Sequence, residues 1–201
     1  MQERAARTRR ALARAAAHEF DRHGYEGSSL AQIARSAGIS LGALTFHFSD
    51  KRGLADAVRR EAHAETLPAV DRATSREPDP VGSVVLLTLA LAELLEDEVA
   101  VRAAARLSRE QPGCSLDWES SWTPTLHDCL PDTPDGEAGP GPDRTALALL
   151  ATHLVMGAEV EIRRRVIQEE DLAGQARARL ARIWTTVLQG RLVRADAEGD
   201  G

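Results

Sequence analysis

Aromatic residues are scarce in this sequence, at 3% of its 201 residues, and lysine occurs once, as Lys51. Residues that favour strands are sparse, whereas alanine, leucine and arginine are abundant. This composition disfavours a β-sandwich or barrel and predicts an all-α fold. Because 43% of the residues are hydrophobic, the chain can bury a core, which excludes wholesale disorder.

Long apolar runs and closely spaced cysteines are also missing. The longest apolar stretch, Val84–Leu95, contains Thr88 and Glu93 and is shorter than the ~20 residues that span a membrane. Cys114 and Cys129 lie fifteen positions apart, a spacing of neither a redox pair nor a zinc site. The polar N-terminus has no apolar core of a secretory signal. We therefore expect a cytoplasmic protein with no membrane partner, no metal and no cofactor.

The net charge of −6 is unevenly distributed along the chain. Residues 1–60 hold eleven basic and six acidic residues, a net charge of +5, and the remainder has a net charge of −11. A basic N-terminal segment on an acidic body is typical of a module that binds an anion such as DNA. The alternative is an arginine-rich helix that only faces solvent.

Hydrophobic periodicity predicts four helices before a polar, proline-marked break at Arg76–Pro80. They are expected at about Ala5–Arg22, Leu30–Ala37, Leu41–His47 and Lys51–Asp71. Serines or Asp50 precede the last three as N-caps, and Gly38 supplies a turn. Over Ser28–Lys51 this gives a helix, a short glycine turn and a second short helix, which is the helix-turn-helix pattern.

The later part of the chain predicts a larger helical body. Its helices are expected at Val81–Glu96, Val99–Glu110, from Pro124 to Pro131 with Thr123 as N-cap, Asp143–Gln168 and Leu172–Val193. The first of these is apolar on nearly all faces, so it should be central and buried.

From Arg7 to Val58 the chain resembles the TetR family of transcriptional repressors. The resemblance lies in an arginine-rich first helix and in "AAAHEFDRHGYEGSSLAQIARSAGIS" and "GALTFHFSDKRGLADAV". The matching positions are Gly24, Tyr25, Ile33, Ala34, Gly38, Ser40, Gly42, Phe48, Lys51 and Leu54. "SLGALTFHFSDKRGLADAV" and the later "RLSREQPG…DWESSW" are similar to the γ-butyrolactone receptors of antibiotic-producing actinomycetes.

This resemblance implies that the N-terminal helices bind a palindromic operator in double-stranded DNA. The residues it assigns to DNA are Ser28, Ser29, Ser40, Leu41, Gly42, Ala43, Thr45, His47 and Lys51. The two serines at 28 and 29 and Lys51 would bind phosphates, and the start of the helix at Leu41 would read base edges. Thr45 departs from the family's usual tyrosine, so a phosphate contact should be lost or replaced by water. Leu41 has an alternative role in covering the turn.

The resemblance also implies that the body binds a small effector and forms a homodimer. Candidate effector residues are Trp118, Trp122, Val85, Leu89, Leu107, Leu126, Val155 and Met156. The two tryptophans lie in an otherwise polar segment, where they either roof a cavity or anchor a loop; the related receptors cover their ligand with a tryptophan from this region. The effector would be a γ-butyrolactone-type signal, an antibiotic or a biosynthetic intermediate.

Dimerisation is expected through the last two helices. Their apolar stripes are Leu147, Leu150, Leu154 and Ala158, and Leu180, Ile183, Trp184, Val187 and Leu188. The same stripes also suit the core of a single chain. A two-fold partner is needed to read two half-sites about one DNA turn apart.

The predicted organisation is a helix-turn-helix DNA-binding domain at 1–50, a connecting helix at 51–75, a ligand-binding and dimerisation domain at 76–195, and a disordered tail at 196–201. The predicted function is a repressor that releases its operator when a small effector binds. An interaction module that keeps the fold without binding DNA is the alternative. An enzyme is disfavoured, because the sequence has no nucleophile elbow, phosphate loop or metal-binding helix motif.

Overall fold

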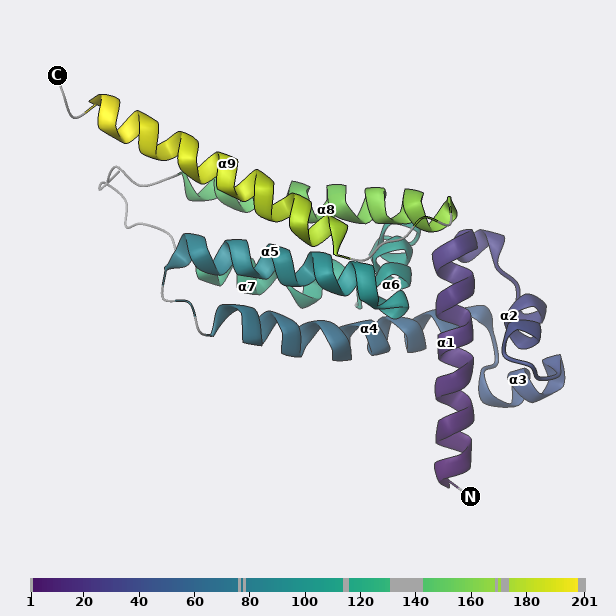
Figure 1. Cartoon of the computed structure of the whole chain (residues 1–201). Helices are drawn as coiled ribbons and strands as arrows, with labels where there is room; N and C mark the ends of the chain where they lie inside the picture. The colour runs from purple at the N-terminus through teal and green to yellow at the C-terminus, as the bar shows by residue number, and fades with distance from the viewer. Residues whose placement is uncertain are drawn as a thin grey trace.

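The structure, a computed structural model, describes residues 2–75, 77, 79–113, 116–130, 143–168, 170 and 174–198, with side chains described between residues 3 and 189. Within these ranges every regular element is a helix, which confirms the predicted all-α fold. Cys114 and residues 199–201 of the expected tail lie outside the described residues. Figure 1 shows a small group of helices near the N-terminus beside a longer bundle.

Three helices and the start of a fourth form the N-terminal part, which we call the head. Its helices are α1 (Gln2–Gly27), α2 (Leu30–Ser36), α3 (Leu41–His47) and the first turns of α4 (Lys51–Thr74). Ser29, Ser40 and Asp50 each accept a hydrogen bond from the backbone N–H three residues on, so these N-caps are confirmed. α1 runs past its predicted end because Gly24, at φ 75° and ψ 179°, bends the chain and lets another turn follow.

The core of the head includes a helix from the body. Phe20, Ile33 and Leu44 are buried in it together with Leu107 of α6 (Val99–Glu110). In Figure 1, α6 stands against α1 at the junction of the two parts. A shift of α6 would therefore act on the packing of the head directly.

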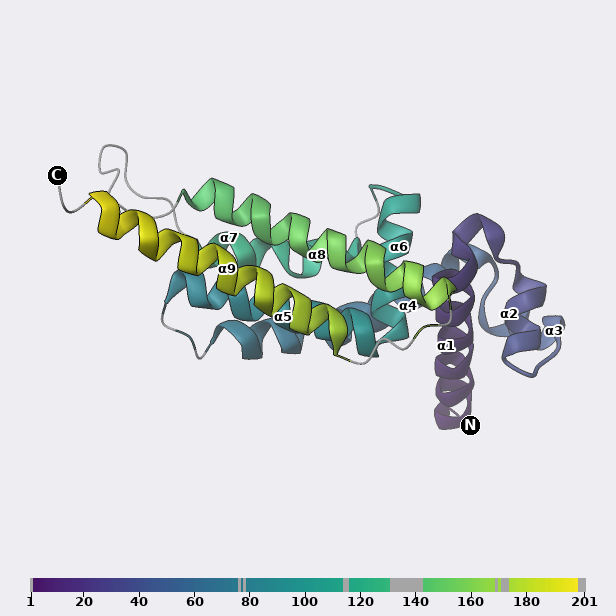
Figure 2. The same ribbon diagram turned by 45° about the horizontal axis from the view of Figure 1, so that its top comes forward.

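The body contains five α-helices and one short 3-10 helix among the described residues. They are α5 (Pro80–Asp97), α6, η1 (Trp118–Ser121), α7 (Thr123–Cys129), α8 (Arg144–Ile167) and α9 (Gln175–Glu198). Figure 2 shows α8 and α9 running along α5, and both helices contact it. Leu87, Leu91 and Leu95 of α5 are fully buried, which confirms the predicted central helix.

Three local predictions differ from the structure. η1 was not predicted. Thr123 does not cap α7 but begins it, and its hydroxyl donates to the Glu119 carbonyl at 2.9 Å, because η1 supplies that acceptor. α9 begins at Gln175 and continues to Glu198, so the first part of the expected tail is helical.

α8 is long and apolar enough to cross a membrane by length and composition, with a mean hydropathy of 1.4 over an 18-residue window, of which 33% is buried. This property of α8 was not predicted from the sequence. Its exposed apolar residues are Leu149, Met156, Val160 and Ile167. Because these residues recur at spacings of seven and four, they lie along one face of the helix.

Of the nine residues in the predicted dimer stripes, four are buried in the core of the single chain, and the other five are half-buried. Leu147, Ala158, Leu180 and Trp184 are buried against other helices of the body, and the Trp184 indole N–H donates to Thr88 at 2.8 Å. Periodicity marks an apolar face, but it does not tell which neighbour covers that face.

Candidate nucleic-acid interface and effector site

The outward face of α3 consists of small or apolar residues. Ser40, Leu41, Gly42, Ala43 and Thr45 are exposed, whereas Leu44 and Phe48 turn into the core of the head. Leu41 is 47% exposed, so its side chain is accessible on this surface. The Thr45 hydroxyl donates to the Gly42 carbonyl at 3.1 Å. The predicted base-reading residues are therefore brought together on one surface.

Phe46 lies on the same surface and was missed from the sequence. Its side chain is 85% exposed. Successive helix positions differ by about 100°, so a residue two positions from both Leu44 and Phe48 points away from the core. That spacing could have identified Phe46 as an outward-facing residue from the sequence alone.

The two serines before α2 have different roles. Ser28 is 4% exposed, and its hydroxyl donates to the carbonyls of Gly24 at 2.7 Å and Glu19 at 3.1 Å. A buried hydroxyl that closes the α1–α2 turn does not present its side chain to a phosphate, so this expectation is corrected for Ser28. Ser29 is exposed at the start of α2, where its side chain also donates to Gln32 at 2.6 Å.

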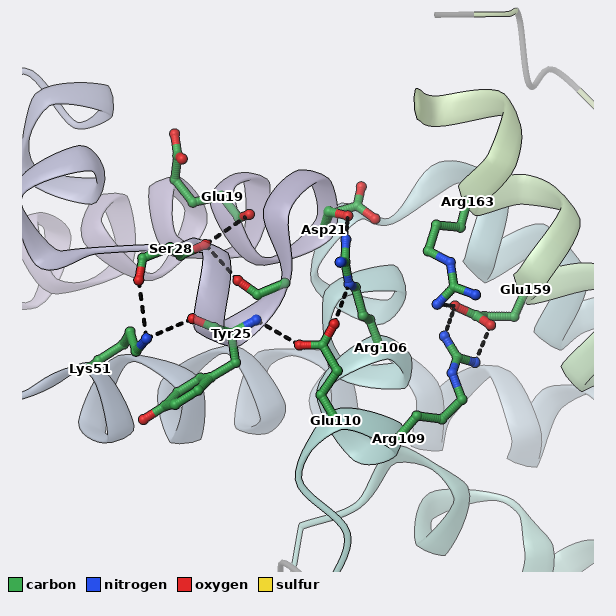
Figure 3. A network of polar contacts seen from close by, with 11 residues as sticks. Glu19, Asp21, Tyr25, Ser28, Lys51, Arg106, Arg109, Glu110, Glu159 and Arg163 are labelled. Atoms are coloured by element: carbon green, nitrogen blue, oxygen red, sulfur yellow. Dashed lines mark hydrogen bonds and ion pairs between the residues drawn. The ribbon is translucent and has the colours of Figure 1, made fainter. Parts of the chain in front are cut away.

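Lys51 is bound within the head (Figure 3). Its ammonium donates to the carbonyls of Tyr25 at 2.7 Å and Ser28 at 3.1 Å, and it lies 4.2 Å from the centre of the Tyr25 ring. A cation at carbonyls just past a helix C-terminus satisfies groups that the helix leaves unpaired. The phosphate contact assigned to Lys51 stays a prediction, and the structure adds a role in joining α4 to the end of α1.

Arg9 of α1 binds the C-terminal end of α3. Its guanidinium donates to the His47 carbonyl at 2.8 Å and lies 4.3 Å from the centre of the Phe48 ring. His47 is half-buried and meets the Phe46 ring edge-on at 5.4 Å. Two helices of the head are thus fixed at their C-termini by side chains of the segments packed against them.

The two tryptophans of the predicted effector site are buried. Their ring centroids lie 5.8 Å apart, and the ring planes are inclined at 56° to each other. The Trp118 indole N–H donates to Thr66 of α4 at 3.0 Å, and its backbone N–H donates to Ser108 of α6 at 2.8 Å. The buried Trp122 indole N–H has no hydrogen-bond partner in the described structure. An unpaired buried donor costs free energy, so a ligand acceptor reaching it would bind favourably.

The other predicted effector residues separate into two groups. Leu126 and Val155 are buried in the same cluster as the tryptophans, with Val85 packed against it. The remaining three lie apart from the tryptophan cluster, and their role stays a prediction: Leu107 belongs to the core of the head, Leu89 of α5 packs partly buried against the cluster of Ala92, Ala158 and Leu180, and Met156 is 41% exposed on α8.

A surface groove lies apart from the tryptophans, between α4, α5 and α9. It has a volume of about 500 Å³ and is lined by Leu89 among the predicted effector residues. Apolar side chains line it together with charged ones, which include Arg72 and the ion pair of Glu93 with Arg177 at 3.4 Å. Neither tryptophan lines this groove.

A polar network connects α6 to the end of α1 (Figure 3). Glu110 accepts the Tyr25 backbone N–H at 2.6 Å and the Arg106 side chain at 2.7 Å, and Arg106 also donates to the Asp21 carbonyl at 2.8 Å. The Asp21 carboxylate pairs with Arg102 at 2.9 Å. Burial raises the pKa of Asp21, and the Arg102 charge opposes that shift.

The same helix is tied to α8. Arg109 forms two hydrogen bonds with the buried Glu159 carboxylate, which also pairs with Arg163 at 3.7 Å. Figure 3 shows these groups continuing the line of contacts from the head. α6 is therefore held by ion pairs on both sides, toward the head and toward α8.

Comparison with known proteins gives matches of two kinds. Residues 12–58 match the family described as "Bacterial regulatory proteins, tetR family". The chain is 35% identical over 109 residues to the A-factor receptor protein of Streptomyces griseus, covering 54% of this chain and 37% of that protein. It is 30% identical over 119 residues to the HTH-type transcriptional regulator BetI of Escherichia coli O45:K1, covering 59% and 55%. The chain thus spans about a third to a half of the length of these curated relatives.

The fold has a solved relative over nearly its full length. A γ-butyrolactone receptor described as an ArpA-like protein superposes with a TM-score of 0.64 and 26% identity, covering 93% of this chain and 89% of that one. These matches are to receptors and transcription regulators, and they support the expectation that the chain is not an enzyme.

Proposed function

We propose that this chain is a TetR-family regulator similar to the γ-butyrolactone receptors, a homodimeric repressor that a small effector releases from operator DNA. The observation that carries the proposal is the outward face of α3, where the residues expected to read bases are exposed together in a segment of net charge +5. A regulator of this kind acts in the cytoplasm, where the chromosome lies.

Dimerisation through α8 is supported by its exposed apolar stripe of Leu149, Met156, Val160 and Ile167. Single exposed apolar residues are ordinary, but a continuous stripe on one helix is typical of an interface. A second copy would cover it, which accounts for the high hydropathy of α8 without a membrane. We infer a two-fold dimer that places two α3 helices on a palindromic operator.

The effector site is inferred to lie at Trp118 and Trp122. Their rings offer a flat apolar surface, and the Trp122 N–H is a buried donor that needs an acceptor. A lactone or another carbonyl compound supplies both parts, a carbonyl oxygen and an apolar chain. This chemistry suits a γ-butyrolactone-type signal, and it also suits an antibiotic or biosynthetic intermediate with a carbonyl group.

The coupling to DNA is inferred to run through α4 and α6. Trp118 is bonded to both helices, through Thr66 and Ser108. α4 leads into the head, and α6 reaches the head through the bond from Tyr25 to Glu110. An effector releases DNA only if it binds more tightly to the body conformation in which the two heads no longer match the half-sites.

The test is a gel shift with the intergenic DNA upstream of the gene. We expect a retarded band that disappears when an organic extract of the source culture is added. Val160→Glu should abolish the band and yield a monomer by sedimentation, because it places a charge in the apolar stripe. Thr145→Glu is the matched control, since Thr145 is exposed near the start of the same helix. Absence of a band on every flanking duplex would favour the interaction module instead.

A further inference from the structure

Phe46 is the most exposed of the large hydrophobic residues in the described chain, at 85%. One turn earlier on α3 is Gly42, and a Cβ built on it meets no atom within 4 Å. The ring therefore projects from a low surface. Within the head the ring is in edge contact with the His47 ring, and most of its surface is left to solvent.

The helix that carries Phe46 is anchored on both sides of this residue. Leu44 and Phe48 anchor α3 in the core, and Arg9 binds both the His47 carbonyl and the face of the Phe48 ring. The His47 ring stands edge-on to Phe46 at an interplanar angle of 84°. Because the backbone at Phe46 is already anchored, little of it needs ordering when a partner covers the ring, which favours binding.

We propose that Phe46 is a specificity-determining residue that packs against the C5-methyl group of a thymine in each operator half-site. This inference rests on the proposed function. The positive charge of the head favours DNA as the occupant over a second protein surface. In the major groove, the thymine methyl is the apolar group that side chains such as Phe contact, and it distinguishes thymine from the other bases.

The experiment starts with selection from a random duplex library by the whole protein, in wild-type, Phe46→Ala and Phe46→Leu forms. The wild type should enrich a sequence with a thymine at one fixed position in each half-site. Phe46→Ala should lose that preference and bind the wild-type sequence about tenfold more weakly. Its binding to a random duplex and its salt dependence should not change, because no charge is removed. Leu67→Ala, which removes another exposed apolar side chain on α4, is the control.

A second measurement replaces each selected thymine in turn by uracil, which lacks only the methyl group. At one position per half-site the wild type should lose about as much affinity as Phe46→Ala loses, and the variant should lose little more. If the losses of affinity from the uracil replacement and from Phe46→Ala add, the inference is overturned. An unchanged thymine preference in both Phe46 variants would also overturn it. If the wild type selects no sequence at all, the proposed function fails instead. If Phe46→Ala does not fold, Phe46→Leu and the uracil series on the wild type still decide.

Discussion

Lys51 was expected to bind a phosphate, yet in the structure its ammonium is bonded to two carbonyls of the α1–α2 turn. Lys51→Met keeps the length of the side chain and removes both hydrogen bonds. Charge-assisted bonds of this kind contribute about 1.5–3 kcal/mol each when buried. Because Lys51 is half-buried, water compensates for part of the loss, and the contact with the Tyr25 ring adds ~0.5–1 kcal/mol.

We therefore expect Lys51→Met to lower the free energy of unfolding by about 2 kcal/mol, which corresponds to a Tm lower by roughly 4–8 °C in a chain of this size. Urea unfolding followed by circular dichroism measures the change. Arg52→Met is the matched control, because it removes the same charge from the next residue, which is exposed. The account of Lys51 is refuted if both variants are equally stable while Lys51→Met alone reduces the salt slope of DNA binding by about one.

Three further variants test other contacts. Gly24→Ala should cost at least about 2 kcal/mol of stability in urea unfolding, because the residue has a positive φ of 75° and its Cβ would lie 2.5 Å from a Glu110 oxygen; a stable variant would contradict this. Arg9→Met should weaken operator binding about tenfold by loosening the end of α3, whereas an equal loss on random DNA would mean that it binds a phosphate. Trp118→Phe and Trp122→Phe both shrink a buried side chain and should both lose stability, but Trp118→Phe should lose about 1 kcal/mol more, because it alone breaks a hydrogen bond. Trp122→Phe should respond less to effector; a larger loss of stability for Trp122→Phe with an unchanged response would count against the effector site.

Local features of the head were predictable from the sequence because each depends on neighbouring residues. An N-cap needs a short polar side chain just before an apolar helix, so Ser40 and Asp50 could be identified. The outward face of α3 also followed from its period. Phe46 was not among the predicted DNA-binding residues, although its spacing from Leu44 placed it on the outward face.

Features that depend on distant segments were not predictable from one sequence. In the sequence, Leu107 looks like an ordinary apolar residue of a body helix. In the structure, α6 places it in the core of the head. Lys51 and Tyr25 are 26 positions apart, and no periodicity connects them. The unpaired N–H of Trp122, in contrast to that of Trp118, became visible only when the surrounding acceptors were placed.

The measurement that tests the central claim most directly is a titration of labelled upstream intergenic duplex with the protein, followed by sedimentation velocity with and without effector-containing extract. The account predicts a complex of one duplex with an even number of protomers, weaker binding as salt concentration rises, and free duplex once the extract is added. Binding by a single protomer, or a complex that the extract leaves intact at all concentrations, would contradict a dimeric repressor that a ligand releases.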